Sequence, residues 1–341
     1  MRAFLLRRHG APARLSLTDL PDPEPGPGQV RVRVEAVGLN YAEVLSRRGL
    51  YGWAPRLPYV PGMEATGRID GVGDGVDPSR LGARVVVGTQ YGAYAEAVVV
   101  GDARALPAMD AWSVEENAAF PVNWMTAWVC LMEMARLRPS DRVLISPAAG
   151  GVGTAAVLIA SRFGCDVLAL AGSDEKLARV RALGDLPPHA ALNYRAPGWT
   201  EALAREASHR GVDVALEMVG GDVFRAATDA LAPLGRVVVA GYAALDYALW
   251  NPLSWLRAWR GMPRMSLDRM LKRSNGMLST HLGYLLKDTA VMGRLWPELV
   301  AFTSGHGIRP VVGHVLPFAD MPAAHELMES RRSYGKIVLR V

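Results

Sequence analysis

The stretch from Asp141 to Gly164 constrains the fold of this chain more than any other. An apolar run of strand length, Arg142 to Ser146, leads into the glycine turn Gly150-Gly151-Val152-Gly153, and an alanine-rich helical pattern follows. Strand, glycine turn and helix in this order are typical of a nucleotide-binding unit. Gly150 would let the backbone approach a pyrophosphate, and Gly153 would let the helix pack close to the strand. The first helical N–H groups would then point at the phosphates.

The glycine motif by itself leaves two interpretations open. Ala148 occupies the first glycine position of the dinucleotide fingerprint G-x-G-x-x-G, so an ordinary turn between a strand and a helix is the alternative. The pattern downstream favours the nucleotide site, because short apolar runs alternate with helical segments, as in a parallel sheet covered on both faces. The sequence therefore predicts an α/β, doubly wound domain with strands at 142–146, 166–171, 190–193, 213–217 and 236–240 and helices at 174–183, 199–210 and 223–231.

The first 120 residues predict a mainly β domain. Val30, Val32 and Val34 alternate with charged residues, so one face of this strand is apolar and the other faces water. Strands are expected at 3–7, 29–37, 83–87 and 94–100, with helices at 41–48, 114–120 and 125–135. The chain should end with a helix at 289–304, a strand at 311–315, a helix at 321–330 and a strand at 336–341.

Composition argues against several other classes of protein. With 341 residues, of which 50% are hydrophobic, the chain can bury two cores. Its net charge of +5 is spread along the sequence, without the basic arm or stripe of a nucleic-acid-binding protein. Cys130 and Cys165 are too few for a disulfide framework or a zinc cage, and both are predicted to be core residues in a reducing compartment. The sequence shows neither a secretory signal nor a spanning segment, so a cytoplasmic location is expected.

The segment 246–275 has a different composition from the rest of the chain. Trp250, Trp255 and Trp259 alternate there with arginines and a lysine. Such a segment could dip into a membrane surface. The burial statistics of aromatic side chains favour instead a helix that packs on the protein or on a partner subunit.

Taken together, four motifs resemble the medium-chain dehydrogenase/reductase superfamily: GLNYAEVLSRRGLY (38–51), PGMEATG (61–67), AAGGVG (148–153) and YGKIVLRV (334–341). FPVNWMTAW (120–128) and STHLGYLLKD (279–288) are most similar to its zinc-free quinone oxidoreductase (zeta-crystallin-like) branch, in the subgroup of synaptic-vesicle membrane protein homologues. The resemblance implies a GroES-like catalytic domain at 1–122 and 287–341, and a Rossmann dinucleotide-binding domain at 123–286. It also implies a homodimer, in which a strand around 276–281 extends the sheet into the partner.

The residues argue against a metal. Zinc-dependent alcohol dehydrogenases of this superfamily carry a G-H-E segment whose histidine binds zinc, and this chain has Gly62-Met63-Glu64. A thioether is a poor zinc ligand compared with imidazole or thiolate. No cysteine lies at 38–41, and no four-cysteine cluster lies between residues 88 and 110. We therefore expect no metal site.

The end of the second predicted strand indicates which nucleotide is bound. NAD specificity normally needs an acidic residue there for the ribose hydroxyls, and Leu170-Ala171-Gly172-Ser173 has none. The resemblance places Ser173, Lys176 and Tyr194 where reductases of the family hold a 2′-phosphate, and Arg195 is a nearby cation. The alternatives are a helix N-cap for Ser173 and a solvated helix face for Lys176. The missing carboxylate predicts NADPH as the cofactor.

Candidate catalytic and further cofactor residues come from the resemblance. Asn40 and Tyr51 match positions that line the substrate cleft, where an amide or a phenol could bond a quinone or enone oxygen. The alternative for Tyr51 is an aromatic residue that packs between the domains. His281 is expected to be a structural histidine whose backbone meets the cofactor. The other expected cofactor contacts are Thr126, Gly220, Gly241, Tyr242, Leu282 and Gly283.

The sequence thus predicts a cytoplasmic, zinc-independent, NADPH-dependent oxidoreductase. Hydride would pass to a quinone or another α,β-unsaturated carbonyl compound, and such chemistry needs no protein nucleophile. A second interpretation keeps the chemistry but changes the substrate to an enoyl thioester or a biosynthetic enone. A third belongs to another class, an NADPH-binding protein with little turnover that associates with membranes or partners.

Overall fold

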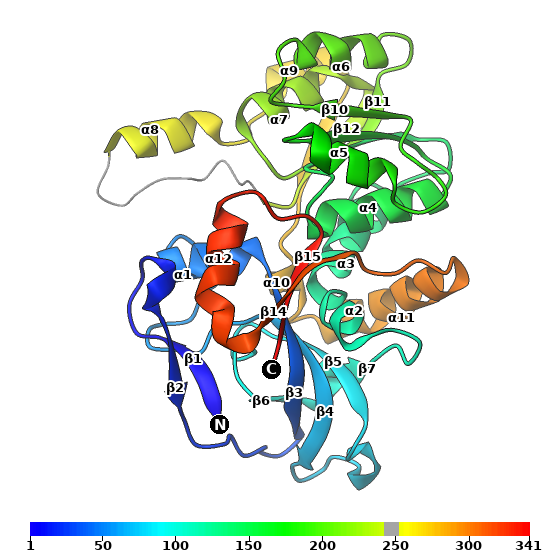
Figure 1. Ribbon diagram of the computed structural model, residues 1–341. Helices are drawn as coiled ribbons and strands as arrows, with labels where there is room; N and C mark the ends of the chain where they lie inside the picture. The colour runs from blue at the N-terminus through cyan, green and yellow to red at the C-terminus, as the bar shows by residue number, and fades with distance from the viewer. Residues whose placement is uncertain (242–251) are drawn as a thin grey trace. The chain divides into compact units, whose positions relative to one another are not determined.

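The computed structural model describes residues 1–241 and 252–341 (Figure 1). Tyr242 and Trp250, which the sequence analysis singled out, lie outside the described residues. The chain divides into two compact units. Unit 1 contains Met1–Asn123, Gly283–Trp296 and Arg309–Val341, and unit 2 contains Trp124–Leu282 and Pro297–Ile308. The expected domain boundaries, 1–122 with 287–341 and 123–286, stay a prediction.

Unit 2 is built on a six-stranded sheet in which every neighbouring pair is parallel. Its spatial order is β10-β9-β8-β11-β12-β13. The chain builds outward from β8 to one side and then returns to β11 on the other, so the strand order reverses between β8 and β11. This is the doubly wound Rossmann order, which confirms the predicted fold class. The strands are β8 (Arg142–Ser146), β9 (Asp166–Ala171), β10 (Ala190–Asn193), β11 (Val212–Glu217), β12 (Leu231–Val239) and β13 (Gly276–Ser279).

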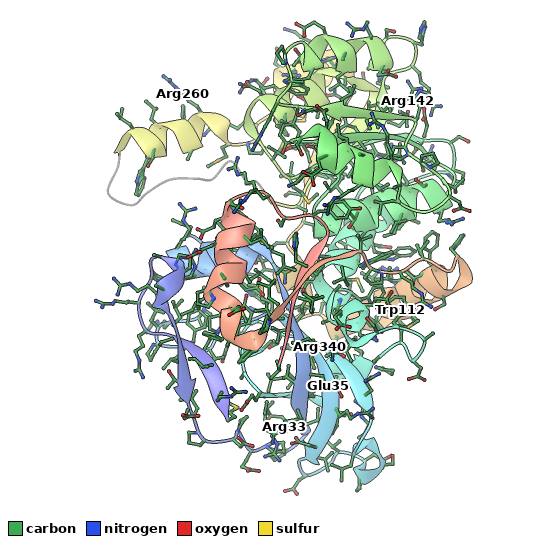
Figure 2. All side chains as sticks on the ribbon, viewed as in Figure 1. Arg33, Glu35, Trp112, Arg142, Arg260 and Arg340 are labelled. Carbon is green, nitrogen blue, oxygen red and sulfur yellow. The ribbon has the colours of Figure 1, made fainter. Side chains whose placement is uncertain are left out.

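Helices cover both faces of this sheet, because right-handed crossovers place successive connections on opposite sides of the reversal. The strands are accordingly mostly apolar; Val143, Leu144 and Ile145 of β8 are completely buried. Arg142, at the start of β8, bonds Asp166 of β9 at 2.7 Å and ties the two strands together (Figure 2). The helices are α4 (Gly151–Arg162), α5 (Asp174–Arg181), α6 (Trp199–Ala207), α7 (Gly221–Asp229), α8 (Pro252–Gly261) and α9 (Leu267–Arg273).

Unit 1 contains a seven-stranded sheet and a separate hairpin. The sheet runs β14-β15-β3-β4-β5-β7, and β6 also pairs with β3. Only β14 and β15 are parallel, so this is the mainly antiparallel β domain that the sequence predicts. The strands are β1 (Arg2–Leu6), β2 (Leu15–Asp19), β3 (Gln29–Leu39), β4 (Glu64–Val72), β5 (Arg84–Gly88), β6 (Ala97–Gly101), β7 (Ala105–Pro107), β14 (Val312–Pro317) and β15 (Lys336–Arg340).

The period-two pattern of β3 builds the core of unit 1. Val30 and Val32 are fully buried and Val34 is nearly so, while Arg31 reaches Asp70 on β4 at 2.8 Å. β15, from the end of the chain, pairs antiparallel with β3. This pairing brings residues separated by almost the whole sequence next to one another. The α-helices here are α1 (Tyr41–Arg48), α2 (Val114–Ala118) and α12 (Met321–Glu329), and the short 3₁₀ turns are Pro12–Arg14, Pro78–Arg80, Asp102–Arg104 and Phe318–Asp320.

Within each of three helices, the chain passes from one unit to the other. They are α3 (Pro121–Trp128), α10 (Leu282–Leu285) and α11 (Thr289–Gly305). The helix predicted at 125–135 is in fact the end of α3 followed by a π-helical turn at Val129–Met134. None of the helices among residues 1–241 and 252–341 has the length and apolar character needed to span a bilayer.

The two cysteines differ in environment. Cys130 is completely buried, as predicted. The prediction that Cys165 is a core residue is wrong. It follows Gly164 between the end of α4 and the start of β9, where it is only partly buried and its Sγ lies 3.4 Å from the carbonyl oxygen of Arg138.

Candidate functional site

Two glycines in the glycine turn of unit 2 have different structural roles. A Cβ on Gly153 would lie 2.0 Å from the carbonyl oxygen of Pro147, so only glycine lets α4 pack this closely on the turn. A Cβ on Gly150 would meet no atom within 4 Å, and Gly150 is the N-cap of α4 without any side-chain cap. Open space at the N-terminus of a twelve-residue helix fits an anion such as a pyrophosphate. Gly151 and Val152 form the first turn of the same helix.

Predicted cofactor residues of unit 2 gather at one edge of the sheet. Carboxyl ends of parallel strands meet at the same edge, and ligands of such folds bind there, at the reversal of strand order. Ser173 follows β9, Tyr194 follows β10 and Gly220 follows β11. Gly241 follows β12 within two residues, and His281 and Leu282 follow β13. Thr126 lies on α3 and is half-buried. Gly283 belongs to unit 1.

A phenol and a guanidinium lie beside Gly172, between β9 and α5. A Cβ on this glycine would lie 3.1 Å from the Tyr194 hydroxyl and 3.3 Å from Nε of Arg195. Burial, and then the charge of Arg195, lower the pKa of the Lys176 ammonium. Ser173 caps α5 by accepting the N–H of Lys176 at 3.3 Å. Four groups suited to a phosphate thus lie together, and no carboxylate stands at the end of β9.

A buried carboxyl shapes the loop after β11, a feature that sequence analysis missed. Glu217 is completely buried, and it accepts the N–H of Val219 at 2.7 Å and that of Gly220 at 3.0 Å. Gly220 has φ +85°, which suits glycine, and it is the N-cap of α7. Burial raises the pKa of Glu217 to about 7, although the two N–H donors oppose this. The available signal was a carboxylate inside the apolar run VALEMV.

Asn40, the first predicted catalytic residue, is the N-cap of α1 in unit 1 and is 6% exposed. Its backbone N–H bonds Oε2 of Glu43 at 2.6 Å, and its Nδ2 bonds Oε1 of Glu64 at 2.8 Å. Nζ of Lys336 donates to its Oδ1 at 2.6 Å and to Oε1 of Glu64. The amide is thus embedded in a buried network of two acids and one base, and its role toward substrate stays a prediction.

Glu43 and Met63 complete this network. Oε1 of Glu43 accepts the N–H of Met63 at 3.0 Å, so the residue in place of a zinc-binding histidine contributes its backbone. Burial raises the pKa of Glu43 to about 7, against the opposing charge of Lys336. Within residues 1–241 and 252–341, no group of three or more histidine, cysteine, aspartate or glutamate side chains is arranged to hold a metal ion.

Tyr51, the second predicted catalytic residue, lies in an aromatic cluster of unit 1. Its ring meets that of Trp53 edge-on at 6.4 Å, and Trp53 in turn meets Tyr284 at 6.4 Å. Burial, followed by the charge of Glu43, raises the pKa of the Tyr51 phenol, which therefore stays protonated at neutral pH. Gly283 packs flat on Trp53, because a Cβ there would lie 2.7 Å from the indole ring. The structure therefore gives Gly283 a packing role.

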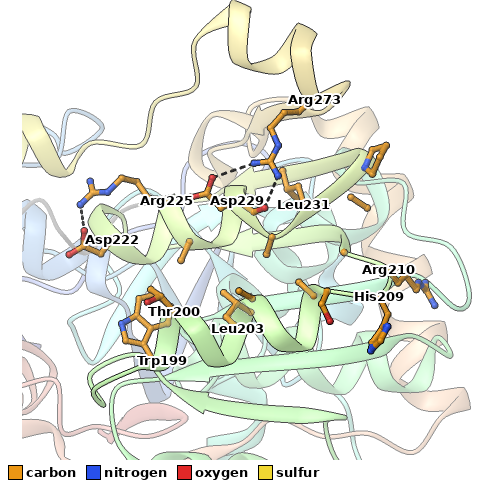
Figure 3. Close-up of a pocket in the computed structure, with 18 residues that line it drawn as sticks. Trp199, Thr200, Leu203, His209, Arg210, Asp222, Arg225, Asp229, Leu231 and Arg273 are labelled. Carbon is orange, nitrogen blue, oxygen red and sulfur yellow. Dashed lines mark hydrogen bonds and ion pairs between the residues drawn. The ribbon is translucent and has the colours of Figure 1, made fainter.

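A groove of about 910 Å³ lies elsewhere on unit 2, between α6 and α7 (Figure 3). Its floor is apolar and includes Leu203, while Arg225 pairs with Asp222 and Arg273 with Asp229 at its rim. None of the predicted cofactor residues that the structure describes lines this groove. Since its rim charges compensate one another, we assign it no ligand.

Comparisons with known proteins found related families and related chains. A protein-family description "Zinc-binding dehydrogenase" matches residues 188–339, and "Alcohol dehydrogenase GroES-like domain" matches residues 26–110. Among curated proteins, the synaptic vesicle membrane protein VAT-1 homolog of Rattus norvegicus is 32% identical over 99% of this chain and 84% of its own length.

Solved structures match the whole chain. An NAD-dependent alcohol dehydrogenase is 33% identical, with a TM-score of 0.85 and complete coverage of both chains. The quinone oxidoreductase of Thermus thermophilus, which was also solved in complex with NADPH, is 35% identical, with a TM-score of 0.81 and complete coverage of both chains. The two proteins use different nucleotides by their descriptions, so the choice of nucleotide depends on the residues of this chain.

Proposed function

The chain belongs to the medium-chain dehydrogenase/reductase superfamily, in the branch that contains quinone oxidoreductases and VAT-1 homologues, and we propose that it is a zinc-independent, NADPH-dependent reductase of quinones or other α,β-unsaturated carbonyl compounds. The observation that carries the cofactor choice is the group around Gly172. Lys176 and Arg195 there would neutralise a 2′-phosphate, which an acidic residue at the end of β9 would repel. The NADPH complex of the Thermus thermophilus relative is consistent with it.

In this proposal the residues of unit 2 hold the cofactor and those of unit 1 hold the acceptor. Ser173, Lys176 and Tyr194 would bind the 2′-phosphate, and the N-terminus of α4 at Gly150 would face the pyrophosphate. Bound NADPH would supply a hydride to an electron-poor carbon of the acceptor. Tyr51, protonated at neutral pH, would donate a hydrogen bond to the acceptor oxygen as negative charge develops there.

The first test measures the oxidation of NADPH, and separately of NADH, against ortho- and para-quinones and simple enones under anaerobic conditions. Lys176→Ala should weaken NADPH binding roughly 10- to 100-fold and leave NADH unchanged, because it removes one charge-assisted hydrogen bond to the 2′-phosphate. Arg179→Ala is the matched control, since Arg179 lies on the same helix and pairs with Glu175 at 3.1 Å. Equal losses of affinity for NADPH and NADH in Lys176→Ala would refute the assignment of Lys176 to the 2′-phosphate.

A second variant tests the chemistry. If Tyr51 is a general acid, Tyr51→Phe should lower turnover on the order of a hundredfold. A loss below about fivefold would make it a positioning residue. Tight NADPH binding without turnover of any quinone or simple enone would favour an enoyl thioester or a biosynthetic enone as the substrate.

One observation favours a second candidate function, attachment to an anionic lipid surface. The described part of the Trp/Arg segment, 252–275, contains six basic residues and one acidic residue, so its net charge of +5 equals that of the whole chain. Arg260 of α8 is exposed (Figure 2). Large apolar side chains are exposed on α8 and α9: Leu253 (73%), Trp255 (50%), Trp259 (57%), Leu267 (67%) and Leu271 (70%). Basic and aromatic residues together suit the interface of an anionic membrane.

Vesicle flotation tests this candidate. The protein should float with vesicles that contain phosphatidylserine but not with neutral ones, and Trp255→Ser/Trp259→Ser should abolish flotation. A protein that stays in the soluble fraction with both kinds of vesicle would refute it. The name of the VAT-1 relative, a synaptic vesicle membrane protein, motivates the experiment.

We propose a homodimer as well. β13 is an edge strand of the sheet of unit 2, with β12 as its one neighbour among the described strands. An edge strand offers unpaired backbone groups to a second copy. Light scattering coupled to size exclusion should give twice the mass of the 36.8 kDa chain, and a monomer mass would refute this proposal.

A further inference from the structure

We propose that Glu64 and Lys336 are positioning residues that hold the side-chain amide of Asn40 in one orientation, which leaves one Nδ2 hydrogen for a substrate oxygen. This inference rests on the proposed function, and on the family resemblance that places Asn40 in the substrate cleft. Both residues are deeply buried, Glu64 completely and Lys336 to 2% exposure. A buried acid and base in a β domain call for an explanation, because burial of an ion pair seldom stabilises a protein more than apolar side chains would.

The charges on either side of the amide fix its orientation. The Lys336 ammonium donates to Oδ1 of Asn40 at 2.6 Å, and Nδ2 donates to Oε1 of Glu64 at 2.8 Å. Rotation of the amide by half a turn would place its NH₂ group against the ammonium and its carbonyl against the carboxylate. Neither pair can form a hydrogen bond. The ion pair therefore excludes the second orientation that an isolated asparagine side chain could adopt.

The two hydrogens on Nδ2 are not held equally. One is bonded to Glu64, while the other reaches Oε1 of Glu43 only at 3.4 Å, which is long for an N–H···O bond. Glu43 already accepts the N–H of Met63 at 3.0 Å through the same oxygen. The second hydrogen is thus the one that a substrate oxygen could take. The ammonium at Oδ1 also polarises the amide, which strengthens its N–H groups as donors.

The fold makes room for this pair and fixes the carboxylate as well. A Cβ on Gly38 would lie 2.5 Å from the carbonyl oxygen of Ala118 and 2.8 Å from both Oε1 of Glu64 and Cε of Lys336, so the strand must carry glycine at this close approach. Oε2 of Glu64 accepts the N–H of Val122 at 2.8 Å, which prevents the carboxylate from turning away from Asn40. The Glu64 carboxylate is therefore held by the N–H of Val122 as well as by Lys336 and Asn40.

The test removes the two charges together, so that neither is left buried without a partner. Glu64→Gln/Lys336→Met should fold, bind NADPH within twofold of the wild-type Kd, and lose at least tenfold in kcat with the preferred quinone. Arg31→Met/Asp70→Asn is the matched control, because that ion pair joins β3 to β4 away from Asn40, whereas Glu64 and Lys336 join β4 to β15 beside it. The control should keep wild-type kcat. A folded Glu64→Gln/Lys336→Met protein with kcat within twofold of wild type would overturn the proposal.

A spectroscopic measurement separates this proposal from the proposed function. In protein labelled with ¹⁵N-asparagine, the two side-chain protons of Asn40, assigned with Asn40→Asp, should give widely separated signals that converge in the double variant. Unchanged signals would overturn the positioning role even if no acceptor is reduced. Absence of turnover in the wild-type protein together with altered signals would instead refute the proposed function alone. If the double variant does not fold, Lys336→Arg can be tested instead, because it keeps the charge but changes the donor geometry. Wild-type kcat together with wild-type Asn40 side-chain signals in that variant would contradict the proposal.

Discussion

Replacement of Glu217 by glutamine should remove a pH dependence from the stability of unit 2. The carboxyl is completely buried, and burial raises its pKa from 4.5 to about 7 in the folded protein. The folded state therefore holds the proton more tightly than the unfolded state. The contribution of this group to stability is fully present below pH 4.5 and is lost as the pH rises through about 7.

The magnitude follows from the size of the pKa change. A rise from 4.5 to about 7 corresponds to about 3 kcal/mol, at 1.36 kcal/mol per pKa unit. Linkage places most of this, about 2–3 kcal/mol, between pH 5 and pH 8, because the unfolded carboxyl is already partly ionised at pH 5. Glutamine keeps the size and one acceptor oxygen for the N–H groups of Val219 and Gly220, but it has no proton to lose.

Urea unfolding, followed by tryptophan fluorescence between pH 5 and pH 8, measures this effect. The free energy of unfolding of Glu217→Gln minus that of the wild type should rise by about 2–3 kcal/mol across the range. Glu175→Gln, an exposed substitution on α5 of the same unit, is the matched control. A constant difference for Glu217→Gln would refute the reasoning, since the carboxyl would then be ionised throughout and the loop N–H groups would outweigh burial.

Three glycines give further predictions. Gly153→Ala should lower the melting temperature strongly, because its Cβ would lie 2.0 Å from the Pro147 carbonyl oxygen. Gly150→Ala should leave the melting temperature nearly unchanged, since its Cβ meets no atom within 4 Å, yet weaken NADPH binding about tenfold or more; equal melting temperatures for the two variants would contradict this. Gly283→Ala should cost about 1–3 kcal/mol in urea unfolding through overpacking against Trp53, and wild-type stability would show that the indole moves aside freely.

Local patterns in the sequence predicted much of the fold because local physics decides it. Val30, Val32 and Val34 alternate with charges on a strand with one wet face, and the structure buries all three. The alternation of strands and helices after residue 141 gave the doubly wound sheet. The sequence did not predict the hairpin strand β2 or the π-helical turn at Val129–Met134. Both segments are too short to show a hydrophobic repeat of their own.

Burial at the ends of elements was harder to predict. Cysteine is among the most often buried residue types. Cys165 is nevertheless partly exposed, because it directly follows Gly164 at the end of a helix. Sequence alone likewise could not tell that Gly283 serves packing, because that role depends on the ring of Trp53, which lies far away in the chain.

The buried charges show most clearly what a sequence reveals and what it withholds. Lys336 in the apolar run KIVLRV and Glu64 at the start of β4 signal, by their cost when buried, that each needs a partner. Neither signal says which partner, because the chain offers 33 acidic residues for one lysine. The answer depends on β15 pairing with β3 in the register that sets Ile337 opposite Leu39, a contact between the two ends of the chain. Asn40, one residue beyond Leu39, then falls beside Lys336. A candidate catalytic residue can thus be named from a local motif, whereas the charges that orient it follow only from long-range strand pairing.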